Sequence, residues 1–278
     1  MKKCLLILMA SLLALPLMGQ KQYVNFDLGG GMQSFIYDLR LGASATKSLG
    51  WSGDLKYVYF FNNHWGAGTG VGMYQYRAKS KLDGEDVHLL FDEYNQLEYY
   101  YTTAYHNWTE RQRLIDVEVP LMAYYEKTDL MSNASLLIGM GGKVILPVSY
   151  NYQVTGGYYE TTGYYPAYNL TIDKLEHHGF GRDETPYKGK LGSNVGFALC
   201  FEMDLIYWFD NVGLYLGTFG TYGLTDMTKH NQLLRDEMQR YNGMLASDQT
   251  DHVSLLNFGF RLGITLPINR PEGAVLGF

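Results

Sequence analysis

Residues 256–266 read Leu256-Asn257-Phe258-Gly259-Phe260-Arg261-Leu262-Gly263-Ile264-Thr265-Leu266, and this stretch decides the fold. Every second residue is a large apolar one, and the residues between them are Asn, Gly, Arg or Thr. A period of two places all the apolar side chains on one face of a β-strand. About ten residues is also the length that a tilted strand needs to cross a bilayer. The stretch is therefore predicted to be a membrane strand with a lipid-facing apolar side.

Seven further segments have the same alternation, or the composition and length of strands. Four of them alternate clearly, and three are blurred by Gly and Tyr on both faces. They lie near residues 24–32, 115–121, 136–144, 195–205, 51–61, 65–77 and 212–224. The sequence thus predicts an all-β chain of eight antiparallel strands.

The composition agrees with a chain in which apolar and polar residues are finely interleaved. Charged residues make up 18% of the 278 residues, where about 25% is usual, while hydrophobic residues reach 46%. No internal apolar run is long enough for a membrane helix. With 22 Lys and Arg against 28 Asp and Glu, the chain has no basic excess that would hold nucleic acid.

The connections between the predicted strands alternate strictly between short and long. The short ones are 62–64, 126–132 and 209–211, and the long ones are 34–48, 78–113, 149–190 and 225–251. Membrane barrels have this asymmetry, with tight periplasmic turns and long extracellular loops. A soluble β-sandwich gives no reason for it, so an up-and-down transmembrane β-barrel with both chain ends in the periplasm is predicted. Ten strands are the alternative, because 78–113 and 149–190 are each long enough to hold a hairpin that would extend beyond the barrel or widen it.

From residue 23 to residue 268 the chain resembles the small outer-membrane β-barrel proteins of Gram-negative bacteria, of the OmpA and OmpX kind, and in particular the PorT-like family. The phrase Ile115-Asp-Val-Glu-Val-Pro120-Leu-Met-Ala-Tyr-Tyr125 is similar to a strand of that family. The barrel-assembly signal of such proteins is matched at Asn257, Gly259, Leu262 and Ile264. The resemblance implies an outer-membrane location, with lipopolysaccharide, outer-membrane lipid, the barrel-assembly machinery and another envelope protein as partners.

The two ends of the chain are predicted to lie outside the barrel. Residues 1–20 combine Lys2-Lys3 with an apolar run of about 13 residues and Gly19-Gln20, which is typical of a cleaved secretory signal peptide. Its removal takes away two positive charges and changes the net charge from −6 to −8. The barrel is expected over 21–268 and a short periplasmic tail over 269–278. After cleavage Cys200 is the one remaining cysteine, so no internal disulfide is expected.

The inward faces of the predicted strands carry six acidic and three basic residues. They are Asp27, Asp54, Lys56, Asp116, Glu118, Lys143, Glu202, Asp204 and Arg261. An eight-stranded barrel is only wide enough for its own side chains, so these charges should pair across the lumen and close it. A small porin or ion channel that uses the acidic surplus is the alternative.

Aromatic residues are concentrated in the second and third long connections. The candidate partner-binding residues are Tyr99, Tyr100, Tyr101, Trp108, Tyr158, Tyr159, Tyr164 and Tyr165. Tyrosine provides amphipathic contact area at low entropic cost, so these connections are expected to bind a partner protein, a glycan or lipopolysaccharide. A position in an aromatic girdle, or in strands that rise beyond the bilayer, is the alternative for several of them.

Signals for catalysis are weak, so no enzyme, cofactor or metal site is predicted. His252 and Ser254 have lipid-facing parity near the outer end of the last strand, as in lipid A deacylases, which leaves a lipid hydrolase as a third hypothesis. His177-His178 has no ligand partner at metal spacing and is predicted to be solvated. A short helix is predicted within residues 229–241.

Overall fold

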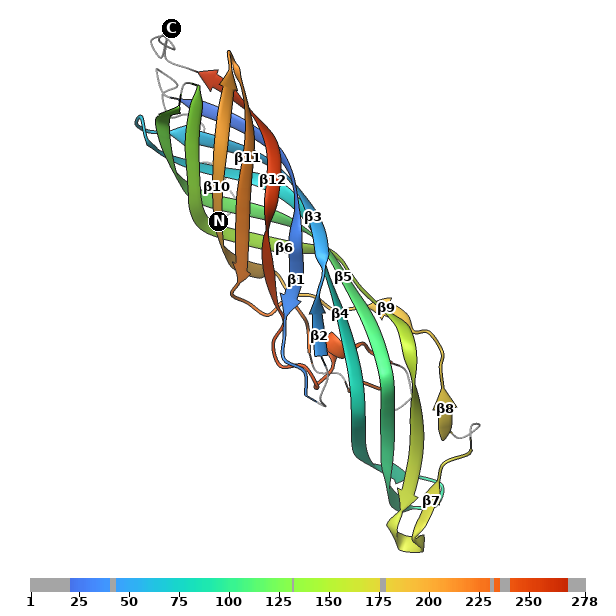
Figure 1. Ribbon diagram of the computed structural model, residues 1–278. Helices are drawn as coiled ribbons and strands as arrows, with labels where there is room; N and C mark the ends of the chain where they lie inside the picture. The colour runs from blue at the N-terminus through green and yellow to red at the C-terminus, as the bar shows by residue number, and fades with distance from the viewer. Residues whose placement is uncertain are drawn as a thin grey trace, which may run out of the picture.

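Eight long antiparallel strands form a closed barrel in the computed structural model (Figure 1). The structure describes residues 21–40, 44–131, 133–175, 179–230, 233–235 and 241–269. The barrel strands are β1 (Gln22–Ile36), β3 (Leu49–Phe60), β4 (Trp65–Asp92), β5 (Leu97–Met131), β6 (Ala134–Tyr165), β10 (Gly196–Phe209), β11 (Val212–Gly223) and β12 (Ser254–Asn269). They follow the order β10-β11-β12-β1-β3-β4-β5-β6, and pairing of β6 with β10 closes the ring. The predicted all-β barrel of eight strands is confirmed.

The short connections, the start of β1 and the end of β12 lie at one end of the barrel. β1 begins and β12 ends there, with Gln22 opposite Asn269, and the tight turns after β3, β5 and β10 lie at the same end (Figure 1). β12 runs to Asn269, slightly beyond its predicted end near Pro267. The predicted signal peptide, residues 1–20, and residues 270–278 of the predicted tail lie outside the described residues.

Three strands continue far beyond the rest of the barrel. β4, β5 and β6 contain 28, 35 and 32 residues, whereas the other barrel strands contain 12 to 16. β4 pairs with β3 only as far as Tyr74, and β6 pairs with β10 only as far as Ile145. Beyond these points the three strands pair mainly with one another and form a sheet that projects from the barrel mouth (Figure 1). We call this projecting sheet the extension.

The extension corrects the prediction that 78–113 is a long loop. The first strand of this hairpin continues to Asp92, turns over residues 93–96 and returns from Leu97. Within 149–190 the chain also stays extended up to Tyr165. Alternating, Tyr- and Thr-rich sequence continues through both segments, so each strand can keep its backbone hydrogen bonds to the next one. The hairpins lengthen the sheet beyond the barrel and add no strand to its wall.

Short elements flank the extension. They are β2 (Ser44–Lys47), which pairs with β4, and β7 (Leu170–Ile172), β8 (Gly181–Asp183) and β9 (Lys188–Lys190), which pair with β6. The part of the chain that is described contains short 3-10 turns but no helix with the length and apolarity to cross a membrane. Much of the predicted helix within 229–241 lies outside the described residues, and the described Arg235 forms a β-bridge with Tyr241.

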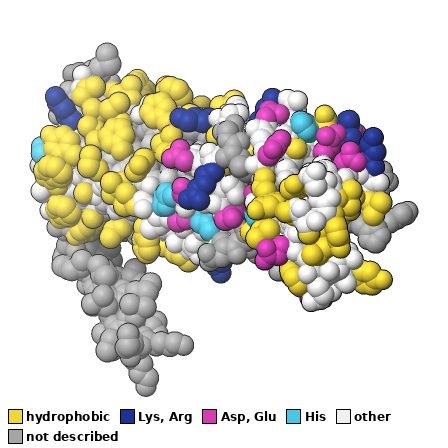
Figure 2. Space-filling view, turned by 90° about the horizontal axis from the view of Figure 1, so that it is seen from below, with side chains coloured by type: hydrophobic (Ala, Val, Ile, Leu, Met, Phe, Trp, Pro, Cys, Tyr) yellow, Lys and Arg dark blue, Asp and Glu magenta, His cyan; other side chains and the backbone are white. Residues whose placement is uncertain are grey.

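The barrel is apolar outside and polar inside, as the alternation predicts. On β12, Phe258, Phe260 and Leu262 are 54%, 62% and 66% exposed, while Asn257 and Arg261 are buried. Apolar side chains gather over the barrel in Figure 2, and charged ones gather where the extension begins and along it. An apolar surface of this extent matches lipid, because soluble monomers rarely expose such large patches.

Two hydrophobic clusters fill the ends of the lumen. The cluster near the short turns includes Tyr23, Phe60, Tyr124 and Trp208. The cluster at the mouth combines inward residues of the barrel and the extension with the connection between β11 and β12. We call the described part of that connection, within 225–253, the cap, because its buried side chains pack over the mouth. They are Met227, Leu234, Tyr241, Met244, Leu245, Ala246 and Val253.

Candidate functional site

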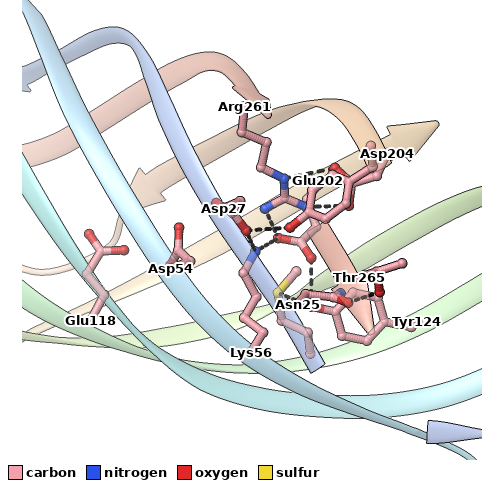
Figure 3. Close-up of polar contacts among 12 residues, drawn as sticks. Asn25, Asp27, Asp54, Lys56, Glu118, Tyr124, Glu202, Asp204, Arg261 and Thr265 are labelled. Carbon is pink, nitrogen blue, oxygen red and sulfur yellow. Dashed lines mark hydrogen bonds and ion pairs between the residues drawn. The ribbon is translucent and has the colours of Figure 1, made fainter. Parts of the chain in front are cut away.

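The central ion pairs of the lumen surround Arg261. Its Nη1 lies 2.5 Å from Glu202 Oε2, and its Nη2 lies 2.5 Å from Asp204 Oδ2 (Figure 3). Lys56 Nζ lies 2.8 Å from the same Glu202 oxygen and 3.4 Å from Asp27 Oδ2. All these side chains are buried. Four strands, β1, β3, β10 and β12, are thereby connected through one network.

A second ion pair lies on the other side of the lumen. Lys143 Nζ is 2.8 Å from Glu118 Oε2. Asp54 receives a 2.8 Å hydrogen bond from the Tyr74 hydroxyl, which in turn lies 3.1 Å from Lys143 Nζ. Eight of the nine predicted lumen residues are therefore in ion pairs or hydrogen bonds.

Asp116 is the ninth of these residues, and its environment differs. It is fully buried on β5, two residues before Glu118, and neither carboxylate oxygen has a hydrogen-bond partner within the described chain. An isolated carboxylate is costly to bury in its charged form. The structure thus places Asp116 next to the network without joining it to the ion pairs.

Inward tyrosines complete the network, and sequence reasoning missed them. Tyr76 donates to Glu118 at 2.8 Å, Tyr124 to Glu202 at 2.6 Å and Tyr215 to Asp27 at 2.8 Å. Each has the inward parity of its strand, which is the signal that could have identified it. Their hydroxyls satisfy carboxylate oxygens that the few cations do not reach.

Glycines make room for these large side chains. On Gly139 a Cβ atom would lie 2.7 Å from the Tyr124 ring and 2.8 Å from Glu202 Cγ. On Gly68 a Cβ atom would again lie 2.7 Å from the Tyr124 ring. The narrow lumen is therefore filled by a few large side chains that pack directly against the backbone of glycine residues. A hydrophobic cluster on each side of the ionic layer completes three successive barriers along the barrel axis.

The cap is attached to the mouth through Glu110, a residue that sequence reasoning did not select. The Tyr241 hydroxyl donates to Glu110 at 2.7 Å, Gln112 donates at 2.7 Å, and the Met244 backbone N–H donates at 3.1 Å. Glu110 lies on the extension and outside the membrane-spanning segments. Burial raises its pKa to about 7, against the opposing effect of these hydrogen bonds.

The predicted aromatic residues are divided between the two faces of the extension. Tyr101, Trp108, Tyr159 and Tyr165 are buried, so they offer no surface to a partner, and the prediction is wrong for them in this respect. Their alternation places them on the inner face, where Trp108 packs against Tyr159, Tyr187 and Tyr241. The guanidinium of cap residue Arg235 lies 3.7 Å from the Tyr159 ring centre.

The other four aromatic residues keep accessible surface. Tyr100 and Tyr164 are 44% and 38% exposed and are stacked on the outer face. Tyr158 is half-buried between His106 and Arg182, and Tyr99 stacks on Tyr165 at 4.9 Å between ring centres. Tyr99 shares the inward parity of the buried Tyr101, so the candidate binding surface is the outer face of the extension with Tyr100, Tyr158 and Tyr164.

The lipid hydrolase hypothesis requires an accessible serine nucleophile, and the structure does not provide one at Ser254. Ser254 is only 3% exposed, so its predicted lipid-facing position is wrong. Its neighbours Val253 and Leu255 belong to the buried cluster at the mouth, which explains the burial. Asp226 Oδ2 does lie 4.0 Å from His252 Nδ1. Such a pair would activate Ser254 only if a substrate could reach the serine hydroxyl, which is buried. Among the described residues no group of three or more potential metal ligands occurs, and His177-His178 lies outside them.

A closed ring of strands with an apolar outside and an ion-paired inside defines an integral membrane β-barrel of the outer-membrane type. No protein-family model and no curated protein matches the chain.

Several solved structures are similar at low identity. The outer membrane protein OprG from Pseudomonas aeruginosa is 10% identical with a TM-score of 0.43, over 91% of this chain and 97% of that one. Neisserial surface protein A is 11% identical with a TM-score of 0.33, over 88% and 96%. Ail, the attachment invasion locus protein of Yersinia pestis, is 11% identical with a TM-score of 0.29, over 90% and 99%. Similarities this low carry no residue role to this chain, whose fold rests on its own strand pairing.

Proposed function

We propose that this protein is a closed β-barrel of the Gram-negative outer membrane that acts as an interaction component, by presenting its extension to a partner protein. The supporting observation is a row of exposed apolar side chains on β4, where Val87, Leu89 and Phe91 are 52%, 53% and 54% exposed. Leu89 lies opposite Tyr100, and Tyr100 lies opposite Tyr164, so the apolar surface continues across three strands. Exposed apolar surface that projects beyond a barrel is typical of a protein-binding site.

The edge of β4 adds a mode of binding. From Leu82 to Asp92 the described chain pairs with β4 on one side only, through β5, because the pairing with β2 ends where Ser44 lies opposite Lys81. An unpaired strand edge can accept an extended segment of another protein. The exposed carboxylates of Asp83 and Glu85 lie along this edge, whereas Asp86 is buried against His88. We therefore expect a partner segment in which apolar residues alternate with Lys or Arg.

The remaining identifications belong to the same proposal. Membership of the PorT-like family is supported by the phrase over 115–125. Recognition by the assembly machinery is supported by Asn257, Gly259, Leu262 and Ile264 on β12, the last strand, which pairs with β1. A glycan stacked on the rings of Tyr100 and Tyr164 is the second candidate ligand, because both rings are exposed.

The test is site-specific photocrosslinking in cells. With a photoreactive residue at Leu89 we expect one protein adduct of defined mass, because this position is at the centre of the apolar row. The same residue at Thr155, which is exposed on the outer face but away from the row, should give no such adduct. Phe91→Asp should abolish the Leu89 adduct without affecting folding, as judged by heat-modifiable gel mobility. Equal adducts at both positions, or a glycan adduct alone, would contradict a protein partner.

A further inference from the structure

Six cationic side chains form two rows on the outer face of the extension at its base. Arg77 lies opposite Arg113, which lies opposite Asn151, which lies opposite Lys190. In the next row Lys79, Arg111, Gln153 and Lys188 are opposite one another in the same order. All six cations are exposed. We call them the basic patch: Arg77, Lys79, Arg111, Arg113, Lys188 and Lys190.

The cations of the basic patch have no acidic counterparts. No described carboxylate lies within ion-pair distance of any of the six, whereas Lys81, one position further along β4, pairs with Asp83 at 3.2 Å. Like charges directly opposite each other on neighbouring strands are destabilising. This arrangement occurs twice, as Arg77 with Arg113 and Lys79 with Arg111, in a chain whose net charge is −6. An anion bound across the rows would remove the repulsion.

The basic patch lies directly beyond the apolar surface of the same three strands. Below Arg77 on β4 the outward residues include Met73, 45% exposed. Below Arg113 on β5 they include Leu121, 72% exposed, and on β6 they include Val148, 65% exposed. Cations that border a lipid-facing surface are typical of sites for anionic lipid head groups. The patch is also at the end of the barrel opposite the short turns, which in outer-membrane barrels is the extracellular end.

We infer that the basic patch binds the phosphate groups of a phosphorylated glycolipid of the outer leaflet, that is, the lipid A part of lipopolysaccharide. The acyl chains lie along the apolar side of β4, β5 and β6, and the sugar phosphates lie across the two rows. Arginine guanidinium groups bind phosphate oxygens in a bidentate manner, and the amides of Asn151 and Gln153 lie within the rows where sugar hydroxyls would meet them. The inference depends on the proposed outer-membrane location but not on the partner protein.

The test is a titration of the full protein, folded in a neutral detergent, with bisphosphorylated lipid A. At low salt we expect Arg111→Gln/Arg113→Gln to bind about 30-fold more weakly than the wild type, since each cation at an anionic membrane surface changes affinity roughly fivefold. The matched control, Lys127→Gln/Lys174→Gln, removes two exposed cations far from the patch and should bind like the wild type. Arg111→Lys/Arg113→Lys keeps the charge and should restore most of the affinity.

Two further probes distinguish the source of the phosphate. Dephosphorylated lipid A should bind the wild type no better than it binds the double Gln variant, and millimolar inorganic phosphate should not displace lipid A. Equal binding of the double Gln variant and the control, or full displacement by inorganic phosphate, would overturn the inference. Phe91→Asp should leave lipid A binding unchanged, so failure of the partner proposal and failure of this inference give different results.

Discussion

Arg261 is the central cation of the ion pairs that fill the lumen. Its guanidinium contacts two carboxylates from neighbouring positions on β10, and Nε donates to Asp204 at 2.8 Å in addition to the two ion pairs of its terminal nitrogens. Glu202 is shared with Lys56, so Arg261 and Lys56 together balance a cluster of acids. Because these charges are buried, the ion pairs stabilise the barrel only while every charge keeps its partner.

Arg261→Gln should lower the free energy of unfolding by about 3–5 kcal/mol, because it leaves buried carboxylates without their cation. Urea unfolding of the barrel in lipid vesicles measures this difference. Lys127→Gln serves as the control, because Lys127 is exposed and its loss leaves no buried acid unpaired. A loss in the Arg261 variant no larger than in the control would show that the ion pairs contribute little to stability.

At the scale of structural elements, the packing of the cap against the mouth depends on whether the Glu110 carboxyl of the extension is protonated. Glu110 is fully buried beneath Tyr241 and Met244, and burial raises its pKa to about 7 from an ordinary value near 4.5. A raised pKa means that the docked cap favours the protonated carboxyl. Docking should therefore be strongest below pH 4.5 and weaken as the pH rises through about 7.

This pH dependence can be measured as protection of the cap from proteolysis or amide exchange, corrected for intrinsic rates. We expect greater protection of residues 244–246 at pH 5 than at pH 8. Glu110→Gln remains neutral and should retain similar protection at both values. A pH dependence that persists in the Gln variant would exclude Glu110 as its source.

For the whole molecule, three successive layers close the path through the barrel. The cap and its hydrophobic cluster cover the mouth, the ionic layer crosses the middle, and the cluster with Tyr124 and Trp208 fills the end near the short turns. The layers lie at different levels of the same barrel strands, and only the cap adds the connection between β11 and β12, so the loss of the cap leaves the other two layers in place. The structure therefore favours a closed barrel over the small channel that the acidic surplus suggested.

In planar bilayers the wild type should show no steady conductance of nanosiemens size, and deletion of residues 229–250 from the cap should not create one, because the ionic layer and the inner cluster remain. Neutral variants of Asp116 and Glu118 test the channel hypothesis directly. Stable current steps in the wild type that change in Asp116→Asn or Glu118→Gln would contradict the closed barrel.

The sequence by itself determined the all-β class, the eight membrane strands and the inward charges, because a period of two assigns each residue to lipid or to lumen without any long-range information. Asp27, Lys56, Glu202 and Arg261 were placed in the lumen in this way. Only the tertiary structure decided which charges pair, because partners such as Lys56 and Glu202 come from strands that are distant in sequence.

The tertiary structure also decided what happens beyond the bilayer. Alternation in β4, β5 and β6 continues past the apolar belt. Whether these strands widen the wall or project from it depends on where β4 stops pairing with β3 and where β6 stops pairing with β10. The same pairing sets the register that brings Arg77, Arg113 and Lys190 into one row. Register between distant segments is a property of the assembled sheet, since local sequence specifies the face of each residue but not its neighbour on the next strand.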